Sequence, residues 1–451
     1  MNSTNQKFFR TVCRLAIPVA LQSMLQSSFS IVDQIMIGQL GSVSVAGVGL
    51  AGKFVGIFTV VTAALGTVAG IMISQYLGQH NKTEVKRSFL LNLYFALALA
   101  ALFTVVCLFF PRQIMGLYTT DPATHAPAAS YLAILSGTFF LTAGATMLST
   151  LFRCMEKASL PLYASLFAAT ANTALNYLLI FGRLGFPAMG VTGAAIATVI
   201  SQFLNLALMF FMYLKQSQLF SLSGTLSFRS VPFDWKQYAS ILLPILVCEF
   251  LWSLGENVYA AIYGRLGTEA SAAMTLTGPV QGLMIGALCG LSQAASVIIG
   301  KMLGNDDRDG AYLAAKKLIR YGFAGSFILS AVIILTRRYY VEIYQVEDSV
   351  KMLTGSILLA YAVIAPFKIQ NMILGGGILR SGGKTKYVMF IDLIGTWIFG
   401  VPLGLFAAFV LKLPVPAVYL MLSLEECIRF AISIVIFRKR RWMTMLRSAG
   451  T

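Results

Sequence analysis

Long apolar stretches are the feature of this chain that most restricts its fold. A helix needs about 20 apolar residues to cross a bilayer. The sequence contains twelve such stretches, at residues 15–38, 46–76, 88–110, 128–151, 161–181, 188–214, 239–263, 272–302, 318–336, 356–379, 386–411 and 415–437. Of its 451 residues, 57% are hydrophobic and 11% are charged, which is far from the balance of a soluble domain. We therefore predict an all-α membrane protein with twelve transmembrane helices.

The basic residues indicate how these helices are oriented. Of the 34 Lys and Arg residues, 24 lie on the side of the termini, in the gaps or within three residues of a stretch's end, 7 lie on the opposite side and 3 lie deep inside the stretches. The positive-inside rule then places both termini in the cytoplasm of a multi-pass protein of the cell membrane. Because the basic residues lie in short gaps rather than on one face of a domain, the net charge of +17 does not indicate nucleic-acid binding.

The first stretch follows Lys7, Arg10 and Arg14, as the apolar region of a signal peptide would. It continues beyond the length of such a region without a small-residue cleavage pattern, so we expect a retained first span.

An internal repeat divides the stretches into two halves. I-G-Q-L-G at 37–41 returns as Y-G-R-L-G at 263–267, an offset of 226, and Pro18 meets Pro244 at the same offset. Each half holds six stretches, so the repeat keeps its orientation, as in the parallel repeats of some secondary transporters. We predict two six-helix lobes at 1–214 and 239–437, a cytoplasmic linker at 215–238 and a basic cytoplasmic tail at 438–451.

Asp33 lies inside the first apolar stretch, where a carboxylate costs roughly 2.5–3.5 kcal/mol on insertion scales. Its repeat partner is Tyr259, so the acid belongs to the N-terminal half alone. Asn172 and Asn176 are four residues apart and share one helical face, and Thr198 follows in the sixth stretch. Oxygen atoms of these kinds suit a sodium ion or a hydrogen-bonded proton, which predicts a cation-coupling group. Alternatively, the two asparagines only hold helices together through hydrogen bonds.

The C-terminal half carries acids in its apolar stretches as well. Glu249 and Glu256 are about two helical turns apart, roughly 10 Å, so both can face one cavity. Asp392 is a third candidate for a C-lobe acidic or substrate site. Each of the two glutamates could instead pair with a basic residue inside the stretches, namely Lys53, Lys368 or Arg429. We interpret Glu425, Glu426 and Arg429 as an internal salt bridge.

Several other kinds of site lack their sequence signatures. The six cysteines are scattered without a C-x-x-C pair, and His80 and His125 have no ligand-like neighbours, so we expect no metal beyond sodium at the Asp33 group. No G-x-x-x-x-G-K-[ST] motif is present, and we expect no cofactor. Pro18 removes one hydrogen bond from the first helix and is a predicted hinge.

Several motifs together resemble the multidrug and toxic compound extrusion (MATE) family over essentially the whole chain. They are L-A-I-P-V-A-L-Q, D-Q-I-M-I-G-Q-L-G, the N-x-x-x-N before L-I-F-G-R-L-G-F-P, L-R-S-G-G-K-T and W-I-F-G-V-P-L-G. The resemblance implies export of organic cations and other amphipathic compounds in exchange for entering protons or sodium ions. By position, Asp33, Asn172, Asn176 and Thr198 match the cation site that the family has in its N-terminal lobe. The acid of the family's seventh span aligns with neither Glu249 nor Glu256.

We therefore predict a cation-coupled antiporter, not an enzyme, that works by alternating access as a monomer among membrane lipids. Its expected substrates are small amphipathic cations. The first alternative is a flippase for lipid-linked saccharides or another lipid, which would need a strongly cationic cavity. A membrane-embedded transferase would need a D-D-x-x-D motif, which the aspartates of residues 306–309 do not form. The bilobed repeat argues against a channel.

Overall fold

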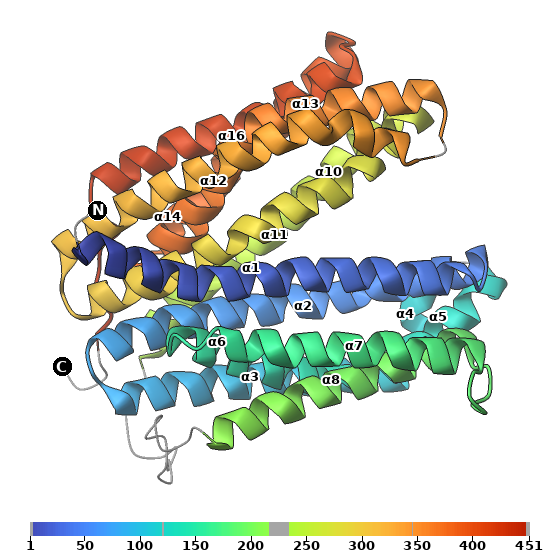
Figure 1. Ribbon diagram of the computed structural model, residues 1–451, viewed down its shortest axis with the longest axis horizontal. Helices are drawn as coiled ribbons and strands as arrows, with labels where there is room; N and C mark the ends of the chain where they lie inside the picture. Colours follow the sequence, from blue (N-terminus) through green and yellow to red (C-terminus); the bar gives the residue numbers. More distant parts are fainter. Residues whose placement is uncertain (1–2, 120, 216–233, 345, 448–451) are drawn as a thin grey trace. The chain divides into compact units, whose positions relative to one another are not determined.

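The computed structural model describes residues 3–119, 121–215, 234–344 and 346–447. Over these residues every regular element is a helix, as Figure 1 shows. The elements up to the predicted linker are α1 (Ser3–Gly38), α2 (Ser42–Gly78), α3 (Lys82–Phe109), α4 (Pro111–Gly116), α5 (Pro122–Leu135), α6 (Thr138–Cys154), α7 (Ser159–Phe181) and α8 (Gly190–Lys215). The predicted linker 215–238 lies mostly outside the described residues, as do residues 448–451 of the predicted tail.

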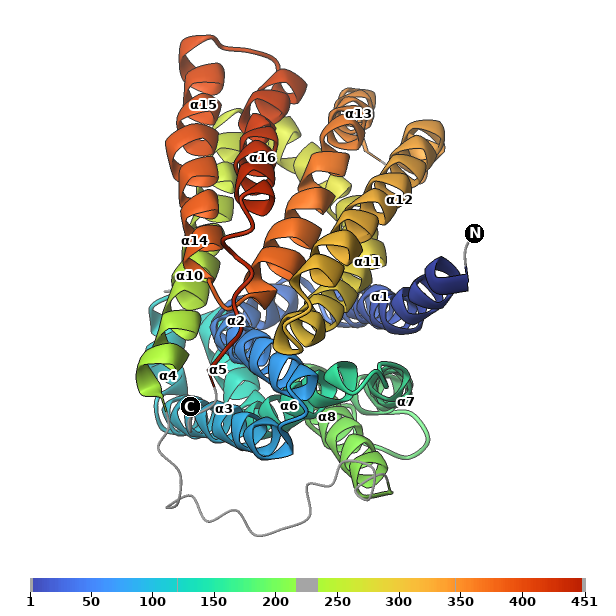
Figure 2. The ribbon, with the colours of Figure 1, turned by 90° about the vertical axis from the view of Figure 1, so that its left-hand side faces the viewer.

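The second half continues with helices, three of which are π-helical. They are α10 (Trp235–Arg265), α11 (Thr268–Gly304), α12 (Arg308–Glu342), α13 (Asp348–Asn371), η1 (Met372–Leu379), α14 (Lys386–Asp392), η2 (Leu393–Gly400), α15 (Val401–Leu405), η3 (Phe406–Val410) and α16 (Val415–Arg438). In Figure 2, α15 and α16 lie side by side, and η3 with residues 411–414 connects them.

Each predicted apolar stretch lies, except for one or two residues at the ends of 88–110, 188–214 and 386–411, within a helix or a run of consecutive helical segments. In the described parts of the chain, ten helices are long and apolar enough to cross a membrane. The pair α5 and α6, which meet at a 48° bend, makes an eleventh span. The last stretch forms α16, which carries Glu425, Glu426 and Arg429. The prediction of an all-α membrane fold is therefore confirmed.

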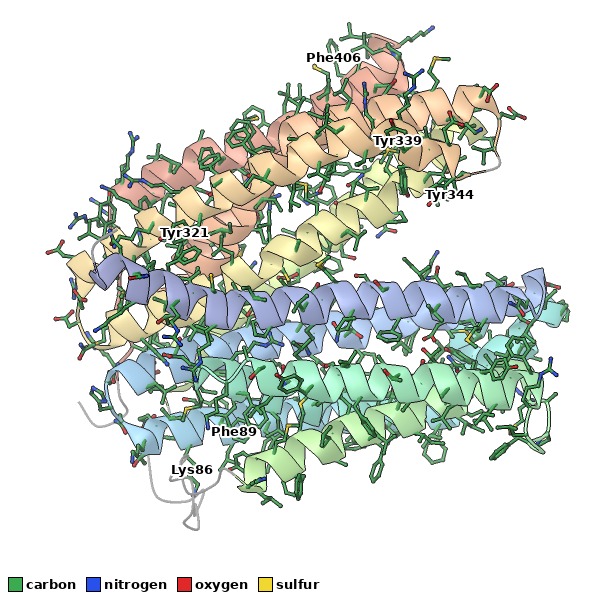
Figure 3. The ribbon with its side chains drawn as sticks, viewed as in Figure 1. Lys86, Phe89, Tyr321, Tyr339, Tyr344 and Phe406 are labelled. Atoms are coloured by element: carbon green, nitrogen blue, oxygen red, sulfur yellow. The ribbon has the colours of Figure 1, made fainter. Side chains whose placement is uncertain are left out.

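The outer surface is apolar, as lipid contact requires. On α12, Tyr339 exposes 78% of its surface, and Phe406 in η3 exposes 49% (Figure 3). Closer to the start of α12, Tyr321 packs edge-on against Phe9 of α1, with ring centroids 5.5 Å apart. Large exposed hydrophobic side chains along helices of this length are typical of a protein that lipid surrounds.

The chain forms two compact units. One contains residues 21–73 and 81–230, and the other contains residues 1–20, 74–80 and 231–451. Helices α1 and α2 thus each contribute to both units. In α1 the boundary between the two units falls between Ala20 and Leu21, two residues after Pro18.

Small residues allow close helix packing in the first of these units. A Cβ on Gly193 of α8 would lie 2.6 Å from the Leu179 carbonyl oxygen of α7, so only glycine permits this approach. Gly144 of α6 similarly faces the Leu206 side chain of α8. Close approach through small residues is a common source of helix association in membranes, where burial of apolar surface gains little.

In the other unit, the segment after α16 packs against the ends of several helices. Trp442 is fully buried, and Leu446 is 6% exposed. Gln75, in the last turns of α2, donates to the Ser381 carbonyl at 2.6 Å and to the Thr444 carbonyl at 3.1 Å. Its side-chain oxygen accepts from the Leu446 N–H at 2.7 Å. These contacts tie residues 442–447 to the end of α2 and to the loop at Ser381.

Candidate functional site

Asp33 of α1 lies against two asparagine side chains of α7. The Asn176 amide donates to Asp33 Oδ1 at 2.7 Å. In the orientation that satisfies its hydrogen bonds, the Asn172 amide donates to both carboxyl oxygens, at 2.9 and 3.2 Å. Both asparagines are buried. The structure thus brings together three of the four residues predicted for cation coupling.

A second contact holds α1 beside α7. Gln22, about three turns before Asp33, donates to the Ser165 hydroxyl at 2.8 Å, and both side chains are buried. Two polar contacts spaced along the same helix pair fix the register of α1 against α7. This register is what places the Asp33 carboxyl opposite the asparagines.

The fourth predicted residue has a different contact. The Thr198 hydroxyl donates to the Ala194 carbonyl at 2.9 Å, within its own helix α8. Ser201, three residues later, lies with its hydroxyl 3.3 Å from the Asn172 amide. The sequence reasoning missed Ser201, although its spacing from Thr198 puts both on one side of the helix. It also missed Tyr131, a buried residue of α5 within electrostatic reach of Asp33.

Among the described residues, no protein cation compensates the charge of the Asp33 group. In the described part of the chain, no Lys, Arg or His forms an ion pair with Asp33. Within the same residues, the buried Asn176 Oδ1 has no hydrogen-bond partner. A carboxylate beside a free carbonyl-type oxygen can take a proton or coordinate a sodium ion.

The acids of the second half are mostly paired with basic side chains. Glu249 accepts from Arg380 Nη1 at 3.2 Å, and Asp392 forms an ion pair with Arg429. Arg429 also lies 3.7 Å from Glu426. Arg380 was absent from the predicted partners because it follows an apolar stretch rather than lying within one.

Glu249 and Glu256 line different cavities rather than one. Glu249 faces a cavity of about 280 Å³, whereas Glu256 faces a smaller one of about 70 Å³ together with Glu425. Lys368 and Glu426 line both cavities.

Glu425 in the smaller cavity accepts from the Tyr259 hydroxyl at 2.8 Å. Tyr259 is the residue that the repeat aligns with Asp33. At the repeat-related position, the second half therefore has a tyrosine hydroxyl bonded to a carboxyl group from α16.

Known proteins resemble this chain in both sequence and fold. The model of the MatE family matches residues 18–178 and 244–406. The "Probable multidrug resistance protein NorM" of Rhizobium meliloti is 25% identical over 90% of this chain and 87% of its own length. An aspartate-to-asparagine mutant of the Vibrio cholerae MATE transporter VcmN superposes with a TM-score of 0.88, at 17% identity, over 97% of this chain and 98% of that one.

A further solved structure has the same fold but a pocket of reversed polarity. It is a transporter of the MOP superfamily from Pyrococcus furiosus, whose reversed pocket polarity is described as suggesting a different function. It superposes with a TM-score of 0.84, at 18% identity, over 95% of both chains. At these identities the solved structures establish the fold, and the charges of the site must be argued from this chain itself.

Proposed function

Because this chain belongs to the MatE family of membrane transporters, we propose that it exports amphipathic organic cations in exchange for an entering proton or sodium ion. The protein is a transporter rather than an enzyme, and its relatives include multidrug efflux proteins. In this proposal it works as a monomer in the cell membrane, surrounded by lipid, with both termini in the cytoplasm.

The observation that carries the proposal is the environment of Asp33. Its carboxyl group receives amide hydrogen bonds from Asn176 and Asn172, has no basic partner among the described residues, and lies in an apolar helix. Amide donors stabilise the ionised form without neutralising it, so a cation entering the site gains the full attraction of the carboxylate.

Coupling requires that the bound cation favours one conformation of the transporter over another. A ligand with equal affinity for both conformations does not change their populations. Moving the equilibrium between them from 1:99 to 99:1 takes a difference of about 5.5 kcal/mol between the ligand's binding free energies for the two conformations. Neutralising Asp33 removes a charge from the apolar interior, so α1 can repack. Pro18 is the proposed hinge of this movement, because it deletes one backbone hydrogen bond shortly before α1 passes from one unit to the other.

The test is efflux of a fluorescent organic cation from proteoliposomes, driven separately by a proton gradient and a sodium gradient. We expect one gradient to drive efflux in the native protein, and Asp33→Asn to abolish it while the protein still folds. Asp121→Asn is the matched control, because Asp121 caps α5 at an exposed position and asparagine can also cap a helix. Preserved coupled efflux in Asp33→Asn would refute the role of Asp33.

The flippase alternative predicts a different outcome. A lipid flippase would respond to neither gradient, although the protein is intact, and would move a labelled lipid-linked saccharide between leaflets. The cavity of about 280 Å³ that Glu249 lines argues against this alternative, because each of its arginines already pairs with a carboxylate. An anionic lipid headgroup would have to displace these carboxylates.

A further inference from the structure

A further cavity lies where the end of α12 faces the start of α13. It measures about 490 Å³, which falls within the usual range of roughly 300–1,000 Å³ for ligand pockets. Its charged lining consists of Arg337, Arg338, Glu342, Asp348 and Lys351. With three bases and two carboxylates, the lining has a net positive charge that a singly charged anion would balance.

This cavity lies at the level of the membrane surface. Helix α12 has no charged residue between Arg320 and Arg337, and these 16 residues span roughly 24 Å of helix. The hydrocarbon core of a bilayer is about 30 Å thick, and long arginine side chains reach outward from its edge. Tyr339 is 78% exposed and lies with Tyr344 at the same end of α12 (Figure 3). Tyrosine is enriched at membrane–water interfaces, so the cavity lies at the depth of the lipid head groups.

Basic residues are concentrated at this cavity against the general trend of the chain. Only 7 of the 34 Lys and Arg residues lie on the side opposite the termini, and three of these seven line the cavity. Arg337 and Arg338, close to the end of α12, interact favourably with the helix dipole. Lys351 lies close to the start of α13, where the dipole is unfavourable for a cation. Helix dipoles therefore do not explain all three.

These basic groups can bind an anion without breaking a buried ion pair. Arg337 Nη1 donates to the Gly355 carbonyl at 2.9 Å, which holds its guanidinium against α13. In the parts of the chain that the structure describes, neither Arg337 nor Arg338 forms an ion pair. Lys351 lies 3.6 Å from Glu342 and 3.9 Å from Asp348, whose side chains are 67% and 99% exposed. Such exposed pairs contribute little, so an incoming anion can replace them.

An apolar surface continues from the cavity toward the middle of the membrane. Met352 lines the cavity and is 73% exposed. Leu359 and Val363, seven and eleven residues later on the same face of α13, are 37% and 57% exposed. On α12, Leu335 is 74% exposed and lies about one turn before Arg338. A soluble anion would leave this surface unused, whereas the acyl chains of a lipid would cover it.

We propose that this cavity binds the phosphodiester head group of an anionic phospholipid. The phosphate lies at Arg337, Arg338 and Lys351, because guanidinium and ammonium groups both form strong hydrogen bonds to phosphate oxygens. The acyl chains follow the exposed face of α13. With both termini in the cytoplasm, the lipid belongs to the outer leaflet. It is a bound partner of the protein rather than its cargo, and the proposal does not depend on the export function.

Native mass spectrometry of the full-length protein in detergent tests the charge requirement. Phosphatidylglycerol and phosphatidylcholine with identical acyl chains are added together in equal amounts. We expect phosphatidylglycerol to be retained at least about tenfold more, because each basic residue near an anionic surface contributes roughly fivefold and two arginines are without an ion-pair partner among the described residues. Equal retention of the two lipids would overturn the proposal. So would displacement of the lipid by an equal amount of glycerophosphoglycerol, which is the same head group without acyl chains.

A single variant locates the site. Arg338→Gln changes an exposed side chain, and we expect it to lower the preference for phosphatidylglycerol about fivefold. Arg265→Gln is the matched control, because Arg265 is exposed at the end of α10, on the same side of the membrane, and does not line the cavity. Its preference should stay within about twofold of the native value. A preference that persists in Arg338→Gln, or that falls equally in both variants, would place the lipid elsewhere and refute the assignment.

Discussion

Gln75 connects three distant segments of one unit through a single buried side chain. It lies near the end of α2 and is 0% exposed. Its amide group bonds to the carbonyls of Ser381 and Thr444 and to the N–H of Leu446. We predict that Gln75→Ala weakens the attachment of residues 442–447 to α2, where the Tyr76 hydroxyl and the Gln79 amide make the other side-chain bonds to this segment among the described residues.

The size of the effect follows from the two hydrogen bonds that Gln75 makes to this segment, with Thr444 and Leu446. A typical intramolecular hydrogen bond contributes about 0.5–1.5 kcal/mol net, so the two together contribute about 1–3 kcal/mol to holding the segment. The full penalty for unsatisfied buried groups does not apply, because the detached segment exposes its carbonyls and N–H to water. Since each 1.4 kcal/mol is tenfold, the detached population should rise by roughly 5- to 140-fold.

Amide hydrogen exchange followed by mass spectrometry measures this population directly. We expect the peptide that contains Thr444 and Leu446 to lose protection by a similar factor in Gln75→Ala, provided that opening and closing are faster than exchange. Gln79→Ala is the matched control, since Gln79 is half-buried and makes one bond, to the Leu446 carbonyl at 2.9 Å. Its effect should stay below about tenfold. Unchanged exchange in Gln75→Ala, or an equal effect in both variants, would refute the reasoning.

Two further predictions concern the Asp33 group and the packing of α11. Asn176→Ala should lower coupled efflux at least about tenfold, because a hydrogen bond to a charged group contributes about 1.5–3 kcal/mol. Thr198→Ala should change efflux less than about twofold, since the hydroxyl bonds to Ala194. Gly304→Ala should lower the thermal unfolding midpoint in detergent, because the new Cβ would collide with the Gln75 carbonyl, and overpacking costs about 1–3 kcal/mol. Gly282→Ala in the same helix should leave the midpoint unchanged or raise it, because no atom lies within 4 Å of that Cβ.

Hydropathy predicted the helices well because a membrane leaves the backbone few alternatives. The boundaries were less predictable, since helices continue beyond the apolar region. The stretch at 318–336, for example, lies inside α12, which spans Arg308–Glu342. The stretch at 128–151 contains the 48° bend between α5 and α6, which its hydropathy does not indicate. The π-helical segments likewise depend on tertiary packing.

In the candidate site, the sequence predicted most of the residues but not the contacts between them. The four-residue spacing of Asn172 and Asn176 indicated a shared face, and the cost of burying Asp33 indicated a need for partners. Their mutual contact depends on the register of α1 against α7, which Gln22 and Ser165 help to set across 143 residues of sequence. No local pattern encodes such a contact. Arg380 was missed as the partner of Glu249 because only basic residues inside the apolar stretches were considered, and Arg380 directly follows one.

The internal repeat also explains why the two halves carry different chemistry. Where the first half has Asp33 on α1, the second half has Tyr259 on α10, whose hydroxyl bonds to Glu425 on α16. The residue 226 positions before Glu425 is Val199 of α8. Glu425 therefore lies on the repeat counterpart of α8, whereas Asp33 lies on α1. In the second half, the cavity that Glu249 lines balances its three acids against Lys368, Arg380 and Arg429. A lining of balanced charge attracts a lone cation weakly, whereas the Asp33 carboxylate, which forms no ion pair among the described residues, attracts it strongly. We therefore place the proposed coupling ion in the first half.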